Sequence, residues 1–239
     1  MEQDFSQLEK NLNLKFKNKK LIKQALVHRS YLNEHPDFEL AHNERLEFLG
    51  DAVLELVTTE YLYLNYPDHP EGEMTNWRAA LVNTQMLASL STELEVNDFL
   101  FLSHGEAKDT GKARELILAN TFEAIIGACY LDRGYKTAKK FIVENALTKL
   151  PNILENKTYI DPKSRLQEET QDLYNLTPSY RVLEETGPDH DKYFVIGVHL
   201  KENLLGQGKG SSKQKAQVSA AKDALKKDKY KNLNLDRQE

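Results

Sequence analysis

The first 150 residues of the chain carry apolar side chains at the spacing of amphipathic helices. From residue 8 to about residue 150, apolar positions recur three and four residues apart, and Gly and Pro are mostly confined to the joints between periodic segments. This pattern predicts an all-α domain. The expected helices cover residues 20–28, 43–63, 73–90, 114–131 and 136–150, with loops at residues 66–70 and 108–112.

The pattern changes after residue 150. Residues 151–160 are polar, lose the helical period and run into Asp161-Pro162, so we predict a linker there. The elements expected beyond it are a helix at 164–173, strands at 179–185, 192–200 and 203–209, and a helix at 212–227. The order α-β-β-β-α predicts a second, α+β domain. The expected division is therefore an all-α domain at 1–150, a linker at 151–160, an α+β domain at 161–230 and a polar tail at 231–239.

Composition restricts the setting in which the chain works. The longest apolar stretches, such as residues 124–130, are far shorter than the ~20 residues needed to cross a bilayer, and residues 1–10 are polar. We therefore expect no membrane segment and no signal peptide. The single cysteine, Cys129, excludes a disulfide within the chain, and its apolar neighbours predict a buried side chain. These features favour the cytoplasm.

Charge is distributed unevenly along the chain. The formal net charge is −5, which argues against a protein that binds nucleic acid through overall positive charge. Residues 201–229, however, hold eight lysines against three acids, a local charge of +5. Any phosphate-binding surface must therefore be local, and the C-terminal part of the chain supplies one.

A stripe of acids marks the helix expected around residues 43–57. Its sequence, NERLEFLGDAVLELV, places Glu44, Glu47, Asp51 and Glu55 at positions i, i+3, i+7 and i+11, which share one helix face. The other sides are largely apolar, so we predict a helix nearly surrounded by protein, with its acids in a narrow cleft. Carboxylates confined in this way repel unless a cation lies among them. The alternative is that the acids form the solvated face of an amphipathic helix, and for Glu55 we retain this interpretation.

Two features favour a cleft over a solvated helix face, and a second helix supplies further candidate ligands. Arg45 lies off the stripe, so the pairing of acids with bases typical of a solvent face is missing. Glycine at position 50 lowers the stability of a helix by about 1 kcal/mol relative to alanine, so its presence suggests that another backbone approaches closely there. In the helix at 114–131, Asn120 and Glu123 stand at i and i+3 in a mostly apolar run. Alone they fit a hydrogen-bonded or capping pair; combined with the stripe they predict an all-oxygen site suited to Mg²⁺ or Mn²⁺.

These segments resemble a known family. NERLEFLGDAVLEL at 43–56 closely resembles the signature of ribonuclease III, a highly specific motif. The family's other blocks are matched in order by ALVHRS at 25–30, EGEMTNWRAALVNTQMLA at 71–88 and ILANTFEAIIGACYLD at 117–132. The second domain, from DPKSRLQEETQ to GKGSSKQKAQVSAAKDAL, resembles the family's double-stranded-RNA-binding domain. The resemblance implies a Mg²⁺-dependent, homodimeric endonuclease of double-stranded RNA, with Mn²⁺ as a possible substitute. It also implies products with 5′ phosphates and short 3′ overhangs, and a part in ribosomal and messenger RNA processing.

The resemblance also assigns roles within the acid cleft. It implies that Glu47, Asp51 and Glu123 hold the metal with Asn120 at a fourth ligand position, and that Asp51 and Glu123 are the catalytic pair. Glu44 corresponds to a residue associated with RNA engagement. Because the family most often has Asp at the position of Asn120, we expect weaker metal binding. The alternative is a catalytically weakened or inactive RNA-binding homologue, against which retention of the three acids argues.

The family dimerises through an apolar face near its signature helix. By resemblance, Phe48, Leu49 and Gly50 are candidate interface residues, and ordinary core packing is the open alternative. In the loop before the second acidic helix, Thr110-Gly111 stands where the family usually has two glycines, a difference that concerns the loop rather than the chemistry.

The second domain carries the residues expected to contact RNA. Ser211 leads into a helix whose first turns carry Lys213 and Lys215, so ammonium groups, backbone amides and the helix dipole can face phosphates; Lys209 extends this patch. The alternative is a solvated helix face. By resemblance, three further residues match positions that reach the minor groove: Gln167, Glu168 and His190. Taken alone, His190 also fits an ordinary exposed loop histidine.

Overall fold

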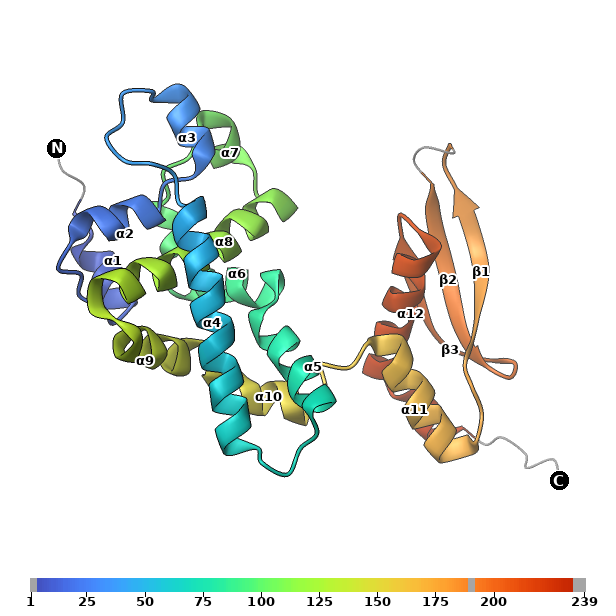
Figure 1. The fold of residues 1–239 in the computed structure, drawn as a ribbon. Helices are drawn as coiled ribbons and strands as arrows, with labels where there is room; N and C mark the ends of the chain where they lie inside the picture. Colours follow the sequence, from blue (N-terminus) through green and yellow to red (C-terminus); the bar gives the residue numbers. More distant parts are fainter. Residues whose placement is uncertain (1–3, 189–191, 234–239) are drawn as a thin grey trace. The chain divides into compact units, whose positions relative to one another are not determined.

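The computed structural model describes residues 4–188 and 192–233, and the chain divides into two compact units, Met1–Tyr159 and Ile160–Glu239. The first unit is helical throughout, as predicted (Figure 1). Its helices are α1 (Ser6–Asn11), α2 (Lys19–Ala25), α3 (Arg29–Glu34), α4 (Glu44–Asn65), α5 (Glu71–Val82), α6 (Thr84–Glu93), η1 (Val96–Phe99), α7 (His104–Lys108), α8 (Lys112–Arg133), α9 (Tyr135–Asn145), η2 (Leu147–Lys149) and α10 (Leu150–Glu155). None of the helices in the described ranges is long and apolar enough to cross a membrane.

Helix α8 runs through the centre of the first unit. Most of its side chains between Ile117 and Cys129 are buried, and it packs against α2, α4, α6 and α9. A helix that is apolar on nearly every side must be enclosed by other elements, which is why α8 is central. Cys129 is fully buried, as predicted, and burial raises the pKa of its thiol to about 11.

The helix predicted over residues 73–90 is wrong as one element. The chain forms two helices, α5 and α6, which are separated at Asn83. Asn83 has extended backbone angles, and its side-chain oxygen accepts a hydrogen bond from the backbone N–H of Met86 at 2.9 Å. This N-cap starts α6 in a new direction. The apolar spacing continues through the break, so periodicity alone does not reveal it. The short helices α1, α3 and α7 were also not predicted, because five or six residues show too little periodicity.

The linker predicted at residues 151–160 is shorter than expected. Residues 151–155 belong to α10, where Ile153 is 4% exposed in the core of the first unit. Pro151 lies in the first turn of that helix, where its missing N–H costs nothing. At the other end, the predicted polar tail begins inside a short helix, η3 (Lys229–Asn232), because Tyr230 anchors this segment with a fully buried side chain.

The second unit has the predicted order α-β-β-β-α. It consists of α11 (Pro162–Tyr174), β1 (Ser179–Thr186), β2 (Tyr193–Leu200), β3 (Asn203–Gly210) and α12 (Lys213–Lys227). The strands form one antiparallel sheet in the order β1-β2-β3, and both helices cover the same face of it (Figure 1). Its core includes Leu166 of α11 and Val198 and Leu200 of β2.

Small residues bring α12 into backbone contact with β3. A Cβ atom added to Gly208 would lie 2.0 Å from the backbone nitrogen of Ala220, and one added to Gly206 would lie 2.5 Å from that of Ala224. Two residues along a strand span ~6.6 Å and four along a helix ~6.0 Å, so alternate glycines can face every fourth alanine. Gly210 continues the series opposite Ala216. This packing fixes the start of α12 next to the end of β3.

Candidate active site and RNA-binding surface

Helices α4 and α8 cross at a pair of glycines. A Cβ atom on Gly50 would lie 1.7 Å from the carbonyl oxygen of Glu123, and one on Gly127 would lie 2.2 Å from the carbonyl oxygen of Leu46. The two backbones are therefore in direct contact, as the sequence predicted for Gly50. Glu47 and Asp51 of α4 flank this contact, so the crossing brings them beside Glu123.

The carboxylates of the two helices interact at this crossing. Burial and, to a smaller extent, the negative charges of Asp51 and Glu47 together raise the pKa of Glu123 to about 8. Burial also raises the pKa of Glu47, with contributions from Glu44 and Asp51. Charges of neighbouring acids contribute to a pKa in this way only where the groups lie close together. The structure thus brings together the acids that the sequence placed on two separate helices.

Asn120 completes this cluster. Its side-chain amide donates a hydrogen bond to the carboxylate of Glu47, which lowers the pKa of Glu47 and partly offsets the effect of burial. Asn120 and Glu47 are both half-buried, whereas Asp51 is exposed. The cluster therefore offers three carboxylates and one amide oxygen from two rigid helices.

The chemistry of this donor set fits a hard divalent cation. Magnesium prefers carboxylate, amide and water oxygens and usually keeps several water ligands. Within the described ranges, no three His, Cys, Asp or Glu side chains stand as a ready-made ligand set. The backbones are fixed by the contact at Gly50 and Gly127, so closer approach of the carboxylates around a cation would come from side-chain rotation.

A cavity of about 480 Å³ continues from this cluster along the first unit. Glu47 and Asn120 line one part of it, and the remaining lining residues come from the α2–α3 junction, the start of α4, α7 and the start of α8. They are His28, Arg29, Ser30, Asn33, Asn43, Glu44, Glu106, Ala113, Leu116 and Ile117. Burial lowers the pKa of His28, so its ring is neutral at neutral pH.

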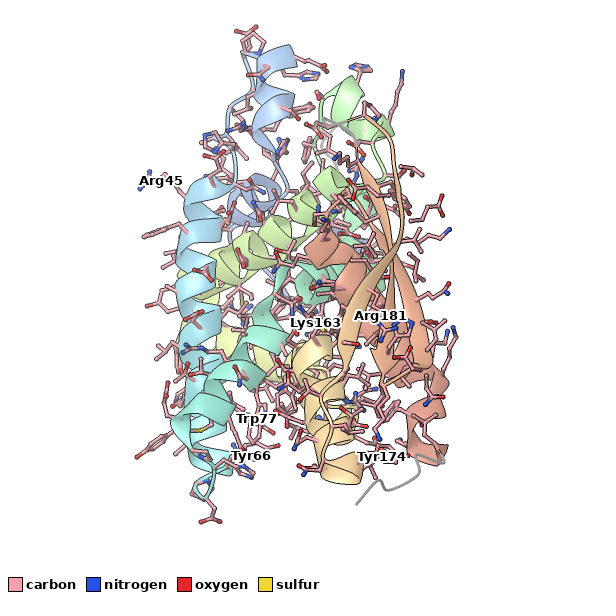
Figure 2. The ribbon with its side chains drawn as sticks, turned by 90° about the vertical axis from the view of Figure 1, so that its right-hand side faces the viewer. Arg45, Tyr66, Trp77, Lys163, Tyr174 and Arg181 are labelled. Carbon is pink, nitrogen blue, oxygen red and sulfur yellow. The ribbon has the colours of Figure 1, made fainter. Side chains whose placement is uncertain are left out.

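Other charged residues of α4 lie as follows. Glu44 is half-exposed, with Arg29 Nη1 3.8 Å from its Oε1 and His42 Nδ1 3.8 Å from its Oε2. Glu55 lies 3.8 Å from Arg78 Nη1, the ordinary surface pairing expected for it. Arg45 projects from α4 away from the other helices (Figure 2). Arg45, the one basic residue of the segment, therefore does not reach the cluster of Glu47, Asp51 and Glu123.

The prediction that α4 is nearly surrounded by protein is wrong. One side of the helix exposes large apolar residues, among them Phe48 at 82% and Tyr63 at 71%. Leu56 and Leu64 are exposed beside them, whereas Leu49 packs against the core and Gly50 against α8. An apolar composition on all sides does not distinguish burial within the chain from burial against a partner. Of the three candidate interface residues, Phe48 alone projects outward.

In the second unit, four predicted RNA-contact residues lie at the junction of β3 and α12. Lys209 is exposed near the end of β3, Ser211 is exposed after it, and Lys213 and Lys215 are exposed in the first turn of α12. Ser212 caps the helix by accepting a hydrogen bond from the backbone N–H of Lys215 at 3.2 Å. The cap leaves the other amides of the first turn and the lysines facing outward.

The remaining predicted contacts are on α11 and in the β1–β2 loop. Gln167 and Glu168 are exposed on α11, on the side opposite Leu166, which is buried in the core. His190 lies outside the described residues. The structure therefore leaves Gln167 and Glu168 accessible to a ligand.

Known proteins resemble the chain along both units. A family model described as ribonuclease-III-like matches residues 18–150, and one described as double-stranded RNA binding motif matches residues 162–227. The chain belongs to the ribonuclease III family. Relatives named Ribonuclease 3 include that of Oceanobacillus iheyensis, 45% identical over 222 residues, which are 93% of this chain and 97% of the relative. That of Dehalococcoides mccartyi is 39% identical over 222 residues, 93% of this chain and 94% of the relative.

A solved structure supports the fold of the first unit. The nuclease domain of ribonuclease III from Campylobacter jejuni is 38% identical, with a TM-score of 0.56, and the match covers 62% of this chain and 99% of that one. The predicted enzyme class, a double-stranded-RNA endoribonuclease of the ribonuclease III type, is confirmed, and the second unit is a double-stranded-RNA-binding domain.

Two features of the site escaped the sequence analysis. Gly127, the partner of Gly50 at the crossing, is one glycine within an apolar run, and its small size was a signal that could have been used. The cavity residues His28 and Arg29 lie in the ALVHRS segment, which the resemblance identified without a role. Their proximity to α4 depends on contacts between distant segments.

Proposed function

We propose that this member of the ribonuclease III family cuts duplex RNA in a magnesium-dependent reaction at the crossing of α4 and α8. The observation that carries the proposal is the backbone contact at Gly50, which places Glu47 and Asp51 of α4 beside the half-buried Glu123 of α8; burial and the charges of Asp51 and Glu47 raise the pKa of Glu123 to about 8. A binding module has no need for acids that repel both each other and RNA. The proposed ligands are Glu47, Asp51, Glu123 and Asn120, and Mn²⁺ is expected to substitute.

A bound Mg²⁺ supplies Lewis-acid chemistry: it makes water a stronger nucleophile and stabilises the charge that develops on the phosphate and the leaving 3′ oxygen. The chain's own part is placement. Of the proposed catalytic pair, Asp51 follows Gly50 on α4 and Glu123 supplies the carbonyl of α8 that Gly50 contacts, so two packed backbones hold the pair together. Asn120 orients Glu47 through the hydrogen bond between their side chains.

We further propose that two copies pair through the exposed apolar side of α4. Phe48, 82% exposed, is the most prominent residue of that side, and large exposed apolar patches mark interaction surfaces. The related structure from Campylobacter jejuni is described by its flexibility in a region involved in dimer formation. Such a dimer presents two sites to opposite strands and would leave 5′ phosphates with short 3′ overhangs. Precursor ribosomal RNA and structured messages, in the cytoplasm, are the proposed substrates.

The deciding experiment is cleavage of a long RNA duplex across a Mg²⁺ titration, comparing the chain with Asn120→Asp. The aspartate removes the amide donor to Glu47 and adds a fourth carboxylate, so it should bind the cation more tightly. We expect both proteins to cut and the variant to need less Mg²⁺. Cleavage by the aspartate variant alone would mean that Asn120 makes this chain a duplex-binding homologue; cleavage by both in EDTA would refute the metal site.

A further inference from the structure

The cavity beside the acid cluster contains an arginine, Arg29, to which the proposed reaction gives no role. Of the described residues that line the cavity, Arg29 is the one Arg or Lys. Its side chain is 73% exposed, and the nearest carboxylate is that of Glu44, at 3.8 Å. A guanidinium in this position can reach both the cavity and the solvent above it. The proposed reaction at Glu47, Asp51 and Glu123 does not use it.

The backbone holds Arg29 and Glu44 next to each other. Asn43 is 3% exposed, its side-chain amide donates to the carbonyl of Ala25 at 3.1 Å, and its backbone N–H donates to the carbonyl of Val27 at 2.9 Å. These bonds tie the end of α2 to the start of α4. The backbone N–H of His28 is bonded in turn to the carbonyl of Phe101 at 3.1 Å. The spacing between Arg29 and Glu44 is therefore set by buried hydrogen bonds.

The charges decide what each residue can do. A carboxylate has no proton to donate and repels a phosphate, so Glu44 cannot itself bind the RNA backbone through its phosphates. A guanidinium suits a phosphate well, since two of its N–H groups can donate to two oxygens in one plane. Glu44 lies between Arg29 and His42, each 3.8 Å away, and so limits the positions that the guanidinium takes.

We propose that Arg29 binds a backbone phosphate of the duplex next to the one that is cut, and that Glu44 is a positioning residue that holds its guanidinium over the cavity. The proposal rests on the proposed function, because the cavity is continuous with the cluster of Glu47 and Asn120. It gives Glu44, associated with RNA engagement by resemblance alone, a physical role that works through Arg29.

The test is a set of binding measurements on duplex RNA in EDTA, over a series of KCl concentrations. The variants are Arg29→Ala, Glu44→Gln and the two combined, with Lys136→Ala as the matched control. Lys136 is exposed in α9, which follows the far end of α8, and it carries the same charge as Arg29. The slope of log K against log[KCl] is negative, and loss of one phosphate contact should make it shallower by about 1. We expect that change, with binding weakened roughly fivefold, for Arg29→Ala and not for Lys136→Ala.

The combined variant separates positioning from direct contact. If Glu44 acts through Arg29, Glu44→Gln weakens binding only when Arg29 is present, and in the Arg29→Ala background it has no effect or tightens binding by removing repulsion. Equal weakening in both backgrounds would mean that Glu44 contacts RNA itself, and an unchanged salt slope for Arg29→Ala would overturn the proposal. Arg29→Lys controls for folding, because it keeps the charge and should keep the slope. EDTA excludes cleavage, so these results stand apart from the Mg²⁺ titration.

Discussion

The contact between α4 and α8 at Gly50 makes a strong prediction about Gly50→Ala. The added Cβ atom would start 1.7 Å from the carbonyl oxygen of Glu123, whereas Cβ atoms essentially never approach another heavy atom within 3.0 Å. The helices must therefore separate by more than 1.3 Å, the difference between these two distances. The obstructing atoms are backbone atoms in the centre of a helix, so no side-chain rotation can relieve the clash.

The cost of this separation follows from what it disrupts. Overpacking in a core costs typically ~1–3 kcal/mol, and a clash with fixed backbone belongs at the upper end or beyond. The same movement shifts Glu47 and Asp51 relative to Asn120 and Glu123 by more than 1 Å, and a misplacement of ~1 Å can reduce catalysis on the order of 100-fold. We expect Gly50→Ala to lose about 3 kcal/mol of unfolding free energy and at least about 100-fold in cleavage rate.

Gly72→Ala is the matched control. Gly72 is in the first turn of α5, and apart from its chain neighbours no heavy atom of the described residues comes within 4 Å of a Cβ atom placed there. Alanine should therefore stabilise the protein by about 0.4–1 kcal/mol, because it restricts the unfolded chain. Urea unfolding and initial cleavage rates at saturating Mg²⁺ would be measured for both variants. If Gly50→Ala matches Gly72→Ala in midpoint and rate, the two helices are not in backbone contact.

Three further predictions concern the acids, the lysines and the apolar surface. The pKa of Glu123, about 8, is raised above its ordinary 4.5, so its stabilising effect is complete below pH 4.5 and is lost as the pH rises through 8. In EDTA, Glu123→Gln should therefore be more stable than the parent at pH 9 by urea unfolding; a parent whose stability shows no such fall with pH would contradict this. Lys213→Ala combined with Lys215→Ala should weaken duplex binding and make the negative slope of log K against log[KCl] shallower by about 2. A slope within error of the parent's would exclude phosphate contacts there. Phe48→Asp should convert a dimer to a monomer in sedimentation equilibrium; an unchanged mass would place the interface elsewhere.

Sequence reasoning located the parts of the site that depend on local geometry. Glu44, Glu47 and Asp51 share a helix face by spacing alone, and the unfavourable Gly50 indicated a close approach before its partner was known. The order of elements in the second unit followed from alternation and turn residues. These inferences succeed because each depends on residues only a few positions apart.

The remaining features depend on contacts between distant segments or on the surroundings of a helix. Asn83 ends one helix and caps the next within an unbroken apolar pattern, and the buried bonds of Asn43 set Arg29 beside Glu44 across 15 positions of sequence. The exposure of Phe48 was missed for a different reason, since apolar residues look alike whether the chain or a partner covers them. The spacing of residues along one segment shows neither the contacts between distant segments nor what covers an apolar side chain.

Asn120 connects stability to metal binding in a way that the crossing explains. The glycine contact holds the acids of α4 close to Glu123, so the folded chain carries their repulsion, which a divalent cation would relieve. An amide in place of a fourth carboxylate reduces that repulsion and donates a hydrogen bond to Glu47. The same replacement removes one negative charge that would attract the cation. A chain with Asn120 should therefore be more stable than its aspartate variant in EDTA and should require more Mg²⁺ for cleavage, and both effects come from a single electrostatic cause.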